Sequence, residues 1–152
     1  MKKKVALLVL IVFLIIIQFF HQEKNQSTEL SAADITKVTN VPDDVLLVLK
    51  TACYDCHSNN TVYPWYNTIQ PIAWWLNRHV VEGKQHLDFS DIGNYTAKKA
   101  KHKLDEVVEV LEKDEMPLFS YTIIHRNAKL NDAQKQLLIN WAKNATVATL
   151  AN

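Results

Sequence analysis

The stretch Cys53-Tyr54-Asp55-Cys56-His57 decides how the rest of this chain is interpreted. Its cysteines are the only two in 152 residues, and a histidine directly follows the second. Cysteines three residues apart on one helical turn project to the same side, so both sulfurs can bond to the edge of one porphyrin. The neutral imidazole of His57 is then placed to be the proximal ligand of the iron. The pattern therefore predicts one covalently attached haem c.

Two cysteines at this spacing have other uses, namely a redox dithiol, half of a zinc site or a structural disulfide. A structural zinc site usually has a second pair of ligands at short spacing, whereas the other histidines are scattered at positions such as His79, His86, His102 and His125. A thioredoxin-like dithiol belongs to a βαβ pattern, and no strand-rich segment of the sequence supplies one. Haem attachment is the interpretation that fits the motif best.

The composition favours an all-α fold. The chain has only two glycines and four prolines, and it is rich in Ala, Leu, Lys, Glu and Asp, which is typical of helices joined by a few shaped loops. Its length corresponds to one small domain plus an N-terminal segment. The formal charge of +1 gives no electrostatic basis for binding nucleic acid, so we expect no such partner.

The N-terminus reads as an export element. A cluster of lysines is followed by an apolar run from Val5 to Phe20, which as a helix would span roughly 24 Å, against about 30 Å for a bilayer core. No small-x-small cleavage site follows Phe20, which favours an uncleaved signal-anchor over residues 1–22. We expect a single-pass protein of the inner membrane whose domain faces the periplasm, or a periplasmic protein if the segment is cleaved.

The remaining chain divides into a tether, a domain and a tail. Residues 23–41 are polar without a sustained period, which predicts a tether; 42–145 form the domain, and 146–152 form a frayed tail. About four helices are expected in the domain. Helical periodicity and end signals place them from Pro42 to Cys53, over 71–82 with Gly83 as C-cap, over 96–113, and over 131–144 with Asn131 and Gln134 in a capping box.

The helix over 96–113 has its lysines in the first half and its acidic residues in the second. Such a run usually forms a solvated helix face. The alternative is a basic patch that docks an acidic redox partner.

Met116 is the candidate for the other side of the iron. It precedes Pro117, so it is expected on a loop, and the only other methionine is the initiator. A thioether favours reduced iron and raises the reduction potential. His125 and His79 are the rival ligands. Tyr63 and Trp65, in an aromatic cluster after the motif, are candidates for a wall that shields the porphyrin.

Several of these motifs together resemble those of the cytochrome-c-like haem-binding domain family, over residues 42–142. The motifs are Cys53-Tyr-Asp-Cys-His57-Ser58, Tyr63-Pro64-Trp65-Tyr66, Asp114-Glu-Met116-Pro117, and Tyr121 followed by His125-Arg-Asn-Ala-Lys-Leu130 and Trp141. The resemblance implies a class-I-like cytochrome c core with covalent haem on Cys53 and Cys56, His57 as the proximal ligand and Met116 as the distal ligand.

The function expected from the sequence is that of a one-electron carrier, tethered on the periplasmic side of the membrane, that exchanges electrons with an unidentified redox protein and is not an enzyme. A haem-based sensor of a small ligand is the first alternative, and it requires an open or labile sixth site. A thiol-disulfide oxidoreductase is the second, and it requires free and reactive thiols.

Overall fold

Helices form all of the regular secondary structure in residues 1–150, which the computed structural model describes. The α-helices are α1 (Lys2–Ile17), α2 (Ile35–Val38), α3 (Asp43–Ala52), α4 (Tyr54–His57), α5 (Ile72–His86), α6 (Ala97–Glu112), α7 (Phe119–Thr122) and α8 (Asp132–Asn144), and the 3-10 helices are η1 (Trp65–Thr68), η2 (Ile92–Asn94) and η3 (Arg126–Ala128). The prediction of an all-α fold is confirmed.

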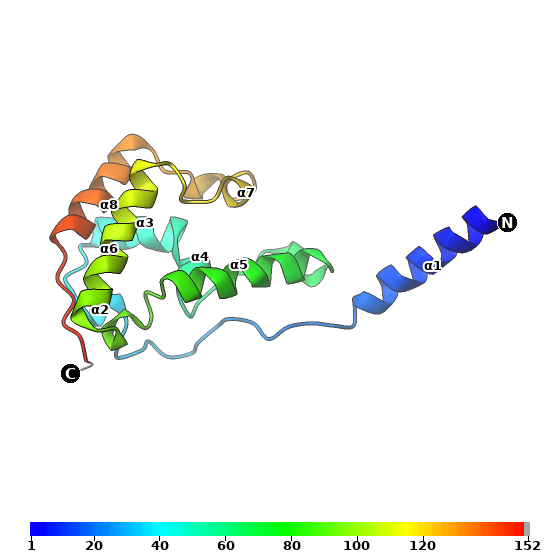
Figure 1. The fold of residues 1–152 in the computed structure, drawn as a ribbon, viewed down its shortest axis with the longest axis horizontal. Helices are drawn as coiled ribbons and strands as arrows, with labels where there is room; N and C mark the ends of the chain where they lie inside the picture. Colours follow the sequence, from blue (N-terminus) through cyan, green and yellow to red (C-terminus); the bar gives the residue numbers. More distant parts are fainter. Residues whose placement is uncertain (151–152) are drawn as a thin grey trace.

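The core lies where α3, α6 and α8 meet. Helices α6 and α8 run antiparallel and pack along their length, and α3 lies against α8 (Figure 1). Leu49, Leu104 and Leu138 contribute side chains to this core that are almost completely buried. The indole N–H of Trp141 on α8 donates to the carbonyl of Asn40 at 3.0 Å, which ties α8 to the chain just before α3.

The helix starts follow the signals in the sequence. The side chain of Thr96 accepts from the N–H of Lys99 at the start of α6, and Asn131 and Gln134 form the predicted capping box at the start of α8. Helix α3 begins directly after Pro42, with Asp43 and Asp44 in its first turn, where the helix dipole favours negative charge. These three helix starts are therefore confirmed.

Helix α5 is longer than the sequence predicts, and the prediction that Gly83 is its C-cap is wrong. The helix continues through Gly83 to His86. A glycine in a helix interior costs about 1 kcal/mol relative to alanine, so this position requires a compensating contact. That contact is with α4.

Residues 23–41 pack on the domain, which differs from the tether expected there. Asn25 donates from its side-chain amide to Ser58 O at 2.7 Å and to Thr61 Oγ1 at 2.9 Å. Asp34 caps α2 by accepting from the N–H and the hydroxyl of Thr36, and Ile35 is completely buried. Hydrogen bonds of this kind do not produce a periodic pattern of hydrophobic residues in the sequence. The sequence therefore predicts no structure for this segment.

The C-terminal tail also pairs with the domain as far as the structure describes it. Ala148 donates its N–H to Val38 O, and Leu150 donates to Gly93 O, each at 2.7 Å. These bonds differ from the frayed tail expected over 146–152, of which residues 151–152 lie outside the described part of the chain.

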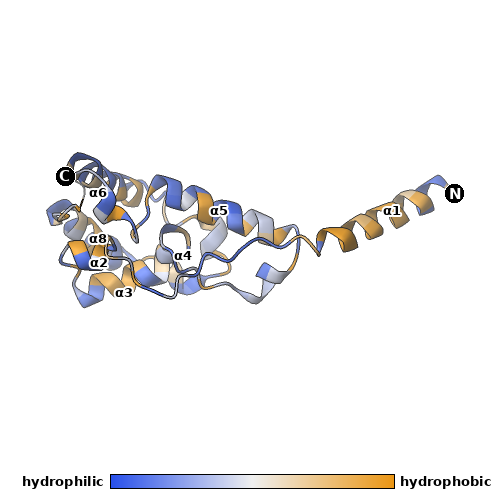
Figure 2. Cartoon of the chain, turned by 90° about the horizontal axis from the view of Figure 1, so that it is seen from below, coloured by the Kyte–Doolittle hydropathy of each residue, from blue (hydrophilic) through white to orange (hydrophobic). Residues whose placement is uncertain are grey.

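Helix α1 projects away from the domain and is hydrophobic along nearly its whole length (Figure 2). Its side chains from Val5 to Ile16 are exposed, whereas Ile17 at its end is buried. None of the helices in residues 1–150 reaches the combined length and hydropathy of a membrane-crossing segment.

The core can be tested with two leucines on helices. Leu104→Ala should lower the free energy of unfolding by about 2–5 kcal/mol, because Leu104 is 0% exposed and the substitution leaves a cavity. Leu47→Ala is the matched control, since Leu47 is 68% exposed, and its effect should stay within about 0.5 kcal/mol. Urea denaturation followed by circular dichroism measures both, and equal effects would contradict the core described here.

Candidate functional site

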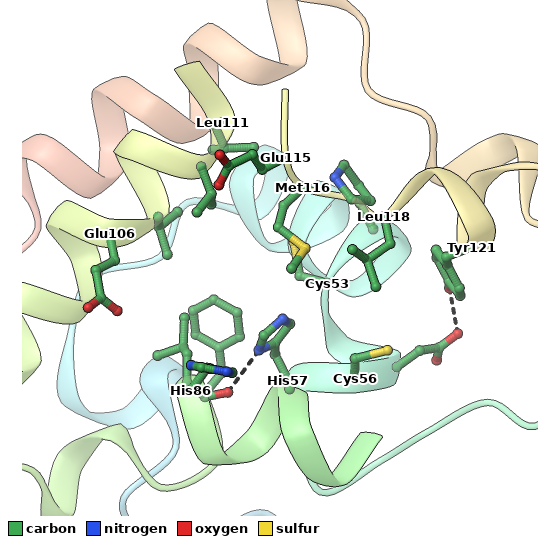
Figure 3. Close-up of a pocket in the computed structure, with 18 of the residues that line it drawn as sticks. Cys53, Cys56, His57, His86, Glu106, Leu111, Glu115, Met116, Leu118 and Tyr121 are labelled. Atoms are coloured by element: carbon green, nitrogen blue, oxygen red, sulfur yellow. Dashed lines mark hydrogen bonds between the residues drawn. The ribbon is translucent and has the colours of Figure 1, made fainter. Parts of the chain in front are cut away.

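A cavity of about 680 Å³ lies between α4, α5 and α6 and is bordered by residues 115–118 and α7 (Figure 3). This volume falls within the range of roughly 300–1,000 Å³ typical of sites for small molecules and cofactors. Much of its lining is apolar, contributed by residues that include Leu87, Phe89, Val107, Val110, Leu111 and Leu118. A large flat apolar ligand would find suitable walls here.

The Cys-x-x-Cys-His motif forms the turn that follows α3. Cys53 ends α3 and begins α4, and its carbonyl accepts the N–H groups of Cys56 at 3.2 Å and His57 at 3.0 Å. Cys53, Cys56 and His57 all line the cavity. The turn thus brings two thiols and one imidazole to the same space.

His57 is oriented by a backbone carbonyl. Its Nδ1 lies 2.9 Å from Leu87 O, and a carbonyl only accepts, so Nδ1 carries the proton. The pKa of His57 is lowered, mainly because the ring is buried. The lowered pKa favours the neutral ring at neutral pH. In that tautomer Nε2 bears a lone pair and is free to coordinate a metal.

The loop from Leu87 to Ser90 forms the base of the site. This loop accepts a hydrogen bond from the ring of His57 and also donates one to its backbone, from Phe89 N to His57 O at 2.7 Å. Ser90 Oγ accepts from Asn59 N at 3.1 Å. The buried ring of Phe89 stacks on Tyr54 with centroids 5.6 Å apart. The loop therefore holds His57 by both its ring and its backbone carbonyl.

Gly83 lets α5 lie directly on the motif turn. A Cβ at this position would be 2.6 Å from the carbonyl oxygen of Cys56 and 3.1 Å from its Cβ. Any side chain here would push α4 away from α5. This contact is the reason that a glycine lies inside the helix.

Asp55, inside the motif, connects it to two further segments. One carboxylate oxygen accepts from Val62 N at 2.9 Å, and the other accepts from the hydroxyl of Tyr121 at 2.6 Å. Its carbonyl accepts from Thr61 Oγ1, also at 2.6 Å. Burial first, and then the bond to Asp55, raise the pKa of Tyr121, so this phenol is a permanent donor. The motif, the loop after it and α7 are thereby joined.

Met116 lies on the side of the cavity opposite His57, and both side chains point into it (Figure 3). Helix α6 ends at Glu112, and Asp114 takes a left-handed conformation with φ of 57°. The N–H of Glu115 then folds back onto Val110 O at 2.9 Å. This reversal turns Met116 towards the motif, so the predicted loop position is confirmed.

Of the two rival ligands and the two proposed wall residues, only His79 lies in the lining of the cavity. His79 lines the cavity, with Nδ1 2.8 Å from Trp75 O. His125 does not line it; its Nε2 lies 2.9 Å from the hydroxyl of Tyr66. Tyr63 accepts from Asn25 N, Trp65 is exposed, and neither lines the cavity.

The two thiols have raised pKa values, because burial disfavours their ionised forms. Burial and then the neighbouring Cys56 raise the pKa of Cys53 to about 12. Burial and then Asp55 raise the pKa of Cys56 to about 11. Reactive redox dithiols have lowered values, so these thiols lack the activation expected of an oxidoreductase.

The donors in the cavity fit a haem. Two thiols, an imidazole with a free Nε2 and an opposed thioether surround an apolar space. Histidine nitrogen and methionine sulfur are both known ligands of haem iron. Across residues 1–150, no group of three or more His, Cys, Asp or Glu side chains is arranged to hold a bare metal ion.

Fold and site together define a helical domain with an apolar cavity that is lined by the Cys-x-x-Cys-His motif. The chain matches the haem-binding domain family over residues 12–144, which is most of its length, so it belongs to this family. Its cofactor is therefore haem. No curated protein and no solved structure gives a significant match.

Some contacts and residues of the site have no signal in the sequence. Leu87 contributes only a carbonyl, and Tyr121 reaches Asp55 across 66 positions, so neither contact has a local signal. His86 lines the cavity near His57, although nothing in the sequence separates it from the other histidines. Gly83 did carry a signal, because a glycine inside a helical period can have a packing reason, but the prediction from the sequence was a C-cap.

The role of Gly83 can be tested against the only other glycine of the chain. Gly83→Ala should destabilise the protein by about 1–3 kcal/mol through overpacking and should also lower the haem content per polypeptide, because the new Cβ displaces Cys56. Gly93 is also crowded, since a Cβ there would be 2.9 Å from Ala33 Cα, but it lies outside the cavity. Gly93→Ala should therefore destabilise without lowering haem content. Visible absorbance and unfolding curves measure both, and normal haem loading in Gly83→Ala would contradict this role.

Proposed function

We propose that this protein is a c-type cytochrome that carries single electrons. The observation that carries the proposal is the cavity in which Cys53, Cys56 and His57 lie across from Met116. Bound haem supplies a reversible one-electron couple at its iron. The two cysteines would hold it by thioether bonds, each formed by adding S–H across a vinyl group.

The chain's own residues would keep the cofactor in one geometry. Leu87 O fixes the proton of His57 on Nδ1 and aims Nε2 into the cavity. The thioether of Met116 would approach from the other side. Held by His57 and Met116 from two sides, the iron would need little rearrangement of its surroundings when its charge changes, which suits electron transfer rather than bond chemistry. No enzymatic activity is proposed, and the electrons would be exchanged with a second redox protein.

We also propose that the domain acts outside the cytoplasm and stays attached to the membrane. Helix α1 begins with three lysines and is apolar from Val5 onwards, as in an export signal. Residues immediately after α1 form part of the folded domain, since Gln18 and Phe20 are both bonded to Gln70. Cleavage within this region would remove structural residues, so retention of the segment is favoured.

Met116→Ala tests the assignment of the axial ligand. The haem should remain on the polypeptide after denaturation and acid–acetone extraction, because its bonds to the cysteines are untouched. The reduction potential should fall by at least about 59 mV, which for a one-electron couple corresponds to a tenfold preference for the reduced iron. Carbon monoxide should bind the ferrous variant quickly. Visible spectra and redox titration measure these changes.

Leu118→Ala is the matched control, because Leu118 lines the same cavity but has no atom that can bind iron. It should leave the potential and the slow reaction with carbon monoxide unchanged. Rapid carbon monoxide binding by the native protein would instead favour the small-ligand sensor. An unchanged Met116→Ala spectrum would remove Met116 as ligand and make His79 the next candidate.

The reactivity of the thiols tests the oxidoreductase alternative. In protein produced without haem, burial and the neighbouring Asp55 raise the pKa of Cys56 to about 11. Relative to an ordinary cysteine, this lowers the thiolate fraction at pH 7 by at least about 100-fold. Alkylation by iodoacetamide in the Cys53→Ser variant should be slower than that of a cysteine peptide by this factor, and its rate should rise with pH up to about 11. Fast alkylation at pH 7 would favour a redox dithiol.

A further inference from the structure

The end of α1 is joined to the domain by a set of amide hydrogen bonds, here called the amide clamp (Gln18, Phe20, Gln70 and Trp74). Gln70 N donates to Gln18 Oε1 at 2.9 Å, and Gln18 Nε2 donates to Gln70 O at 3.2 Å. Phe20 O accepts from Gln70 Nε2 at 2.9 Å and from the indole N–H of Trp74 at 3.1 Å. Gln70 is only 3% exposed. The clamp therefore fixes the direction in which α1 leaves the domain.

Exposed apolar side chains lie around the clamp. This exit patch consists of Phe19, Phe20, Trp65, Ile69 and Ile72, with Phe19 81% and Trp65 78% exposed. Phe19 and Phe20 follow the end of α1, and Ile69 and Ile72 flank the clamp residue Gln70 in the sequence. Trp65 belongs to η1, which packs on α5. The exit of α1 and the start of α5 lie at the same end of the domain (Figure 1).

The length of α1 indicates that the exit patch contacts lipid. Its 16 residues span about 24 Å, whereas the hydrocarbon core of a bilayer is about 30 Å thick. A short apolar helix is accommodated when the bilayer thins locally and the flanking residues enter the interface. Tryptophan and other aromatic side chains are suited to this layer.

We propose that the exit patch lies in the headgroup region of a lipid bilayer, so that the end of the domain, and not α1 alone, contacts the membrane. The inference rests on the membrane attachment proposed above. The amide clamp makes it specific, because a domain on a flexible tether could rotate freely, whereas this domain would be held in one orientation. The surrounding apolar residues and α1 would enter the same bilayer as one continuous surface.

Photolabelling from the lipid phase tests the proposal. The full haem-loaded chain is placed in vesicles of phosphatidylethanolamine and phosphatidylglycerol that contain a phosphatidylcholine with a diazirine at the headgroup end of its acyl chain. After illumination, mass spectrometry should find labels in α1 and in peptides that contain Trp65 to Ile72. The peptide with Leu47, exposed on α3 and distant from the exit of α1 (Figure 1), should stay unlabelled as the internal control.

A double variant gives the second readout. Ile69→Glu/Ile72→Glu should reduce labelling of the 65–72 peptides to the level of the Leu47 peptide, while labelling of α1 and the visible haem spectrum stay unchanged. Labelled α1 with an unlabelled 65–72 segment in the native chain would overturn this inference alone. If α1 were also unlabelled and the protein stayed in solution, the membrane attachment itself would fail, whereas the haem function would be untouched.

Discussion

The close approach of α5 to the motif turn is the contact on which the geometry of the cavity depends. Gly83 allows the backbone of α5 to lie against the carbonyl of Cys56, and the helix then continues far enough for Leu87 to follow it into the loop that orients His57. A single missing side chain thus determines both the position of the second thiol and the direction of the imidazole. The intrinsic cost of a glycine within a helix is small beside the consequence of losing this geometry.

The two sides of the cavity are built by different means. The side of His57 is held by backbone groups of the loop that follows α5. Phe89 N donates a hydrogen bond to the carbonyl of His57, and Leu87 O accepts one from its ring. The side of Met116 depends on a chain reversal after α6 at Asp114. Asp55 and Tyr121 connect the two sides, because their bond links the motif turn to α7, which follows the Met116 loop. The two sides of the cavity are therefore connected to each other by hydrogen bonds and by the chain itself.

The sequence was most informative where a signal is local. Helix α8 with its capping box, helix α6 and the motif turn follow from spacing and end residues alone. The packing of residues 23–41 did not, since it depends on bonds such as that of Asn25 with Ser58, which leave no periodic trace. Tyr63 and Trp65 were expected near the porphyrin because they follow the motif closely, but the loop directs them away from the cavity. Nearness in sequence does not establish which surface a loop residue faces.

The order of the contacts along the chain has a consequence for assembly. The motif is complete at His57, whereas the facing walls come from α6, the Met116 loop and Leu138 on α8. The segment before α3 is also fixed by late residues, through Trp141 with Asn40 and Ala148 with Val38. Contacts this distant in sequence form late in folding. Both cysteines therefore emerge from synthesis before the structure that will enclose them, and during that interval their thiols remain accessible.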